Sequence, residues 1–83
     1  MTHASHPGII KRLKRAEGHL RSVIAMMEQG RPCLDLAQQL HAVEAAVANA
    51  KRELIHDHIE HCLEGGENTR HDLAEIKQLA KYL

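Results

Sequence analysis

The stretch from Cys33 to Glu64 contains neither glycine nor proline, and this absence limits what the chain can fold into more than any other feature. Pro32 stands just before it, where proline is favoured in a first helical turn, and Gly65-Gly66 follows it. The stretch is rich in alanine, leucine, glutamate and glutamine, which are good helix formers. It therefore predicts one continuous helix of about 30 residues, roughly 45 to 50 Å long at 1.5 Å per residue.

Two shorter helices are predicted on either side of this central helix. Apolar residues recur at helical spacing between Pro7 and Gly30, and a second apolar periodicity runs towards Leu83. Thr69, with Asp72 three positions later, resembles a capping box at the start of the last helix. The predicted fold is all-α, with three helices and two short turns in a single domain of residues 1–83.

The central helix is apolar on more than one face, which predicts a homo-oligomer. One stripe and several off-stripe residues share this character; the stripe is Leu36, Leu40, Val43, Val47, Ala50 and Leu54, and the others are Leu34, Ala37, Ala45 and Ala48. A chain of 83 residues buries only a modest fraction of its surface. Two short helices of the same chain cannot easily cover both faces, so a second copy is expected to do so.

Composition narrows the classes of function. Tyr82 is the only aromatic residue, so the chain offers no platform for stacking bases or sugars. The first ten residues lack the basic and apolar regions of a signal peptide, and no apolar run approaches the length needed to span a bilayer. We therefore predict a cytoplasmic protein without a membrane partner, whose two cysteines act as ligands or redox sensors rather than as a structural disulfide.

His58 and Cys62 are four residues apart, a spacing that places both on one face of the central helix and allows them to chelate one metal ion. A histidine and a cysteine also occur at this spacing by chance, and cysteine can be an ordinary core residue. Two ligands are an incomplete site. The only other cysteine, Cys33, is 25 residues before His58, or about 37 Å along a continuous helix.

Two antiparallel copies of the central helix would bring these ligands together. Their crossing point would lie near residues 45–48, "AAVA", where small side chains permit close approach. A two-fold dimer would then have two sites, each with Cys33 from one chain and His58 and Cys62 from the other. His3 and His6 are either a fourth ligand or simply exposed. His56 and His61 lie on other helix faces, which favours solvated side chains or outer partners of the site.

Two segments carry a resemblance to a known family: "RLKRAEGHLRSVIAMMEQGRPC" and "QQLHAVEAAVANAKRELIHDHIEHC". Along essentially its whole length the chain resembles the CsoR/RcnR family of bacterial metal-sensing repressors. The resemblance implies a three-helix protomer, an antiparallel dimer and a dimer-of-dimers tetramer. It also implies that Cys33, His58 and Cys62 occupy the family's ligand positions, shared across the dimer.

Members of the family differ in effector. Cu(I) sensors use Cys, His and Cys; Ni(II) and Co(II) sensors add an N-terminal nitrogen or histidine; formaldehyde or persulfide sensors have an altered His or second Cys. All three ligands are present here. Pro32 stands where copper sensors usually have tyrosine, and helix three offers Glu75, with Gln78 nearer the position of the usual glutamate. Because His19 also replaces a usual glutamine and the N-terminus bears histidines, we favour Ni(II) or Co(II), with Cu(I) as the alternative.

The basic residues between Lys11 and Arg21 are the predicted contacts to DNA. In a single subunit, a solvated charged face is the simpler explanation of these residues. In a tetramer the stripes repeat and can neutralise several phosphates at once. By resemblance Arg12 and Arg15 are the main contacts, with Lys14 and Arg52 supporting. The prediction is a repressor, not an enzyme: the apo form binds operator DNA, of G/C-tract type by analogy, and metal releases it so that an efflux gene is expressed. A thiol-reactive sensor of persulfide or formaldehyde is the further alternative.

Overall fold

The computed structural model describes residues 6–64 and 70–83, which form three helices and no strand within these ranges. Helix α1 is His6–Glu28, α2 is Cys33–Glu64 and α3 is Arg70–Ala80. The predicted all-α fold with a long central helix is confirmed. The predicted stop at Gly65-Gly66 and the capping residue Thr69 lie outside the described residues.

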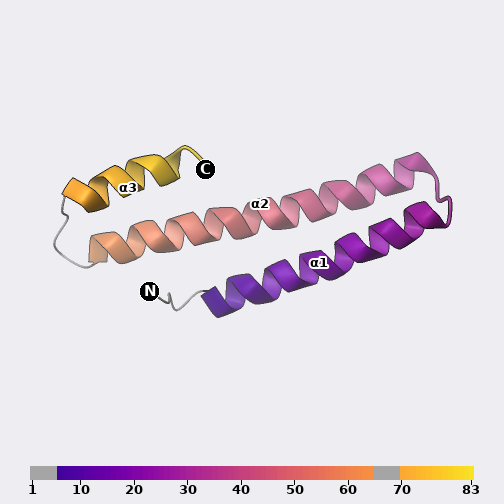
Figure 1. Cartoon of the computed structure of the whole chain (residues 1–83), viewed down its shortest axis with the longest axis horizontal. Helices are drawn as coiled ribbons and strands as arrows, with labels where there is room; N and C mark the ends of the chain where they lie inside the picture. The colour runs from indigo at the N-terminus through magenta and orange to yellow at the C-terminus, as the bar shows by residue number, and fades with distance from the viewer. Residues whose placement is uncertain (1–5, 65–69) are drawn as a thin grey trace.

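Helices α1 and α2 form an antiparallel hairpin, and α3 folds back beside the C-terminal part of α2 (Figure 1). The molecule is consequently long and flat, measuring 55 by 23 by 13 Å. The start of α1 lies at the same end of the hairpin as the end of α2 (Figure 1). Among the described helices, none is both long and apolar enough to cross a lipid bilayer.

A glycine turn reverses the chain between α1 and α2. Gly30 has φ of +74°, its N–H donates to Met27 O at 3.1 Å, and the Arg31 N–H donates to Met26 O at 3.1 Å. These two bonds make a Schellman motif, which requires the left-handed conformation that glycine adopts without strain. The next helix starts at once, since the Leu36 N–H donates to Pro32 O at 3.1 Å. The position of Cys33 is therefore fixed by this turn.

The core is a single seam between α1 and α2. On α1 this core uses one residue in seven, Ile9, Ala16 and Val23. Helix α2 contributes Val43 and Ala50, and Ile55 is buried nearer its C-terminal end. The two alanines allow close approach of the helix axes. One seam is a small core for a chain of this length.

One side of the hairpin is left uncovered and apolar. Five residues at seven-residue spacing define this apolar stripe, and each is more than two-fifths exposed: Leu13, Leu20, Leu40, Val47 and Leu54. The whole chain exposes 6494 Å², whereas a compact monomer of 9.3 kDa would expose about 5,000 Å². The excess indicates surface that a partner could bury.

Candidate metal centre and nucleic-acid interface

Two of the predicted metal ligands, His58 and Cys62, lie one turn apart near the C-terminal end of α2. Both side chains are partly buried. The Nε2 atom of His58 is 2.9 Å from Oε1 of Glu75, which α3 brings over this end of α2. The site therefore has a carboxylate neighbour within the same chain.

The contact between His58 and Glu75 makes Glu75 the candidate outer partner from α3. From the sequence, Gln78 was nearer the expected place, but the Gln78 side chain is exposed one turn farther along α3. A carboxylate on one imidazole nitrogen fixes the ring orientation and makes the other nitrogen a stronger metal ligand. If Nδ1 of His58 binds the metal, Glu75 supports it in this way.

The surroundings of Cys62 favour its neutral thiol. Partial burial is the largest cause of the raised pKa of Cys62, followed by the negative charges of Asp72 and Glu75. The thiolate is the form that binds metal, so an incoming cation must displace a proton here. The two carboxylates that disfavour the thiolate would in turn attract the metal cation.

Cys33, the third predicted ligand, lies at the opposite end of the same helix. It is exposed and is the first residue of α2. Because α2 is continuous through Glu64, the separation from His58 is about 37 Å. Among residues 6–64 and 70–83 no group of three His, Cys, Asp or Glu side chains could hold a metal ion. Within one described chain, Cys33 is thus not brought to the other two residues.

The candidate ligands at both ends of α2 nevertheless lie on the same side of the helix as the apolar stripe. Cys33 is seven residues before Leu40, and His58 is four residues after Leu54, so all of them lie on one side of α2. Val47 is as far along the helix from Cys33 as it is from His61. An antiparallel pairing of two α2 helices centred on Val47 would therefore set Cys33 of one copy level with the partner's His58–Cys62 segment.

The other histidines considered as ligands or outer partners differ in their position and exposure. His6 is partly buried and begins α1, whose start lies at the same end of the hairpin as the end of α2 (Figure 1). His3 falls outside the described residues. His56 and His61 have exposed side chains. Of the two candidate fourth ligands, the structure thus describes only His6. A fourth ligand would have to lie at this end of the hairpin, because His58 and Cys62 lie near the end of α2.

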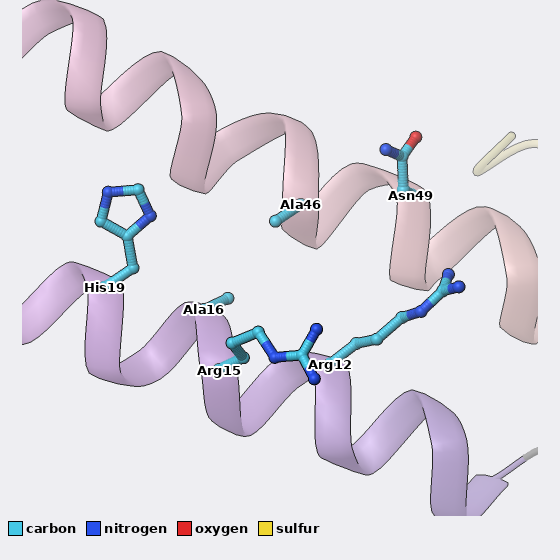
Figure 2. Close-up of a pocket in the computed structure, with 6 residues that line it drawn as sticks. All are labelled: Arg12, Arg15, Ala16, His19, Ala46 and Asn49. Atoms are coloured by element: carbon cyan, nitrogen blue, oxygen red, sulfur yellow. The ribbon is translucent and has the colours of Figure 1, made fainter.

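The other side of the hairpin is polar and contains a cavity of about 510 Å³ between α1 and α2. Two predicted DNA contacts, Arg12 and Arg15, line it from α1, and Ala16 and Ala46 project towards one another beside them (Figure 2). His19 and Asn49 complete the lining of this cavity. The exposed Lys14 and Arg52 are not among the lining residues.

Three contacts organise this polar side. His19 Nε2 donates to Gln39 Oε1 at 2.6 Å, which links α1 to α2. Arg12 Nη1 lies 2.6 Å from Glu53 Oε1, again across the two helices. On α2 itself, Arg52 Nη1 donates to Asn49 Oδ1 at 3.0 Å.

Glu53 and Gln39 were not predicted from the sequence as part of a site, although a signal for them exists. When two helices fold back at Gly30, residues whose numbers sum to about 63 become neighbours in the antiparallel hairpin. Arg12 with Glu53 comes within two of this sum, whereas His19 with Gln39 falls five short of it. The turn therefore narrows the possible partners of Arg12 and His19, and the stagger of α1 against α2 decides which of them meet.

Comparison with known proteins yields a family, curated relatives and a solved structure. A family model described as metal-sensitive transcriptional repressor matches residues 5–83. The copper-sensing transcriptional repressor CsoR of Bacillus subtilis is 44% identical over 55 residues, which cover 66% of this chain and 54% of that protein. CsoR of Mycobacterium tuberculosis H37Rv is 33% identical over 70 residues, covering 84% of this chain and 59% of the relative. This chain thus spans about half the length of such curated relatives.

The solved structure is that of the nickel-responsive transcriptional regulator InrS. The two chains superpose with a TM-score of 0.85 and 32% sequence identity, and the match covers 100% of this chain and 98% of that one. The three-helix arrangement is therefore shared over the entire length.

Proposed function

The chain belongs to the family of metal-sensitive transcriptional repressors, and we propose that residues 1–83 act as a single metal-sensing, DNA-binding domain. Its apo form binds operator DNA and represses a metal efflux gene. Binding of Ni(II) or Co(II) lowers the DNA affinity and permits expression. The family is one of repressors rather than enzymes. We place the protein in the cytoplasm, where thiol ligands remain reduced.

One observation supports the proposed metal site: α2 is continuous and has candidate ligands at both ends, on the side of the apolar stripe. We propose that Cys33 of one protomer binds the same metal ion as His58 and Cys62 of its partner. The thiolates and the imidazole form a soft ligand set that suits late first-row transition metals. The small residues near Val47 allow the close approach that this sharing needs.

The exposed apolar stripe supports an antiparallel dimer, and we propose that two dimers form a homotetramer. Burying the stripe between two hairpins would make a four-helix core from side chains that one protomer leaves in water. Additional exposed apolar side chains on α3 and the C-terminus, Leu73, Tyr82 and Leu83, offer a second surface for dimers to join. Two-fold symmetry then gives two equivalent metal sites in each dimer.

Ni(II) and Co(II) are the favoured effectors because the N-terminal segment offers imidazole nitrogens at the end of the hairpin where α2 ends. His6 begins α1 at the end of the hairpin that carries His58, and His3 precedes it in the sequence. Added imidazole nitrogens suit square-planar Ni(II) or higher-coordinate Co(II). Pro32 also replaces the tyrosine that copper sensors usually carry.

Cu(I) is a second candidate, and a specific contact favours it. Glu75 reaches His58 at 2.9 Å, as the helix-three glutamate of copper sensors would do. The two relatives named above are called copper-sensing. Two thiolates and one imidazole also match trigonal Cu(I). A persulfide or formaldehyde sensor of the same fold is a further candidate, and such a thiol-reactive sensor would respond without His58.

DNA binding is assigned to the polar side of the hairpin, with Arg12 and Arg15 as the main contacts and Lys14 and Arg52 as supporting ones. Metal must bind the DNA-free conformation more tightly if it is to release the operator. A tenfold loss of DNA affinity corresponds to about 1.4 kcal/mol of coupling. The turn at Gly30 is a direct mechanical link, because it joins α1, which carries the arginines, to Cys33.

The experiment is fluorescence anisotropy with labelled duplexes from the promoter region of the protein's own locus, including any G/C tract. We expect tight binding by the apo protein and weakened binding after saturation with Ni(II) or Co(II). A parallel titration with Cu(I) decides between the metals. If persulfide or formaldehyde still lowers the DNA affinity of the His58→Ala variant, the protein is a thiol-reactive sensor. Unchanged DNA affinity under all three metals would refute the metal-sensor proposal.

A further inference from the structure

The guanidinium of Arg12, which lines the cavity on the polar side, already holds an anion. Its Nη1 lies 2.6 Å from Oε1 of Glu53, and the two side chains are 55% and 48% exposed. An ion pair in such an exposed position stabilises a fold only weakly, because water screens it. Glu53 is therefore a partner that another anion can replace.

The same cavity has further donors for an anion. Arg15 contributes a second guanidinium, and Asn49 an amide. Asn49 Oδ1 is already occupied by the bond from Arg52, so the free group that Asn49 can offer is its amide N–H₂. The volume of about 510 Å³ is larger than a single phosphate needs, which suits a backbone phosphate with its sugars attached.

The geometry points to this cavity as the binding site for one backbone phosphate of operator DNA, with Glu53 as the anion that the phosphate displaces from Arg12. This inference rests on the proposed DNA-binding function and deepens it. Arg12 and Arg15 hold the phosphate, and Asn49 donates from α2. Glu53 is a built-in competitor that limits the affinity for DNA.

The exchange follows from the chemistry of the groups. A planar guanidinium can bind a phosphate or a carboxylate through two parallel N–H bonds, so both anions compete for the same donors. After displacement the Glu53 carboxylate stays nearby, because it is tethered to α2, and it repels the phosphate. Its charge thereby reduces the effective charge that Arg12 offers to DNA. Removal of that charge should strengthen phosphate binding for any duplex sequence.

The test compares the full-length apo protein with Glu53→Gln, which keeps the shape of the side chain and removes its charge. We expect operator and nonspecific duplexes to bind about 3- to 10-fold more tightly, and the slope of log affinity against log salt to steepen by up to about one per engaged protomer. Both quantities come from anisotropy titrations at several salt concentrations. Thermal unfolding measured by circular dichroism establishes that the variant is folded.

Glu17→Gln is the matched control. Glu17 is likewise an exposed acid paired with an arginine, at 3.6 Å from Arg21, but it does not line the cavity or contact Arg12. It changes the net charge by the same amount, but its weaker and more exposed contact with Arg21 lies outside the cavity, so it should strengthen binding and steepen the salt slope much less than Glu53→Gln does. An equal gain in affinity from both substitutions would show a general charge effect and overturn the role of Glu53.

A double-mutant cycle with Arg12→Gln completes the test. If Glu53 acts through Arg12, then Glu53→Gln should improve binding much less in the Arg12→Gln background. Unchanged or weaker DNA binding by folded Glu53→Gln, while the wild type binds DNA and releases it with metal, would overturn this inference and leave the proposed function intact. Failure of the wild type to bind any duplex would refute both.

Discussion

The two ends of α2 differ in how much of a metal site each contains. The first end offers Cys33 alone, exposed and next to the glycine turn. The last end offers His58 and Cys62 together, partly buried and with Glu75 of α3 beside the imidazole. One protomer thus contains two unequal and complementary parts of the proposed site, held apart by a continuous helix. A two-fold arrangement of such protomers would unite each part with its complement.

The largest effect is expected from removing a thiolate at either end. Cys33→Ala and Cys62→Ala should each abolish the thiolate-to-metal charge-transfer band and lower metal affinity by more than roughly 100-fold, because both sites of a dimer lose a ligand. Absorption spectra during Ni(II), Co(II) and Cu(I) titrations measure this. The exposed His41→Ala, in mid-α2, is the control and should retain the full band. A complete band in Cys33→Ala would mean that the first end does not contribute.

A smaller effect, specific to the last end, is expected from Glu75→Gln. Loss of the carboxylate beside His58 Nε2 should weaken metal binding by about 10- to 100-fold, since outer partners fix the ring orientation and raise its basicity. Competition with a chelator of known affinity gives the value. Gln78→Ala, on the same helix, should have little effect. If Gln78→Ala weakens binding more than Glu75→Gln does, the assignment of the outer partner is wrong.

At the first end, Gly30→Ala should destabilise the fold without touching a ligand. Gly30 has φ of +74°, so an alanine there would cost about 1–2 kcal/mol of left-handed strain, although its Cβ would meet no described atom within 4 Å. We expect a fall in Tm of several degrees in thermal unfolding. Gly18→Ala, in the middle of α1 with equal space, should instead stabilise the helix. A Tm that Gly30→Ala does not lower would show that the turn imposes no strain.

The smallest effect concerns the thiol at the last end. The pKa of Cys62 is raised by burial and then by Asp72 and Glu75, so its thiolate fraction at neutral pH is reduced and increases as pH rises. Asp72→Asn should lower this pKa and speed alkylation of Cys62 at pH 8 by about two- to threefold, because the thiolate is the reactive form. Mass spectrometry of iodoacetamide-treated apo protein gives the rates of both cysteines.

The alkylation rate of Cys33 is the internal control of that measurement. The rate at Cys33 should not change in Asp72→Asn, because Cys33 lies at the other end of α2. The raised pKa of Cys62 also means that the folded state gains from the protonated thiol, a contribution that is lost as pH rises through the folded pKa. Equal acceleration at both cysteines would contradict the assignment of Asp72 as a cause.

Much of the fold could be predicted because it depends on local sequence. The absence of glycine and proline between Cys33 and Glu64 determines α2, and Gly30 with Pro32 determines the turn. The distance between Cys33 and His58 then follows from helix rise alone. These features require no knowledge of which side chains meet across helices.

The contacts between helices could not be predicted in the same way. Glu75 and Gln78 are one turn apart on α3, and only the angle at which α3 packs on α2 decides which of them faces His58. Likewise, the sequence predicted Arg12 as a contact to DNA but indicated no partner for it within the chain. Its contact with Glu53 depends on the exact stagger of α1 against α2. Stagger and packing angle are set by side-chain shapes along the whole seam, which a residue pattern does not specify.

The most direct test of the central claim is complementation between two defective chains. Cys33→Ala retains the His58 and Cys62 end, and the double variant His58→Ala/Cys62→Ala retains Cys33. Neither alone should show the charge-transfer band, but coexpression should restore about a quarter of the wild-type metal content, because half of randomly paired dimers contain one complete site. If the coexpressed chains bind no more metal than either variant alone, the site is not shared between protomers.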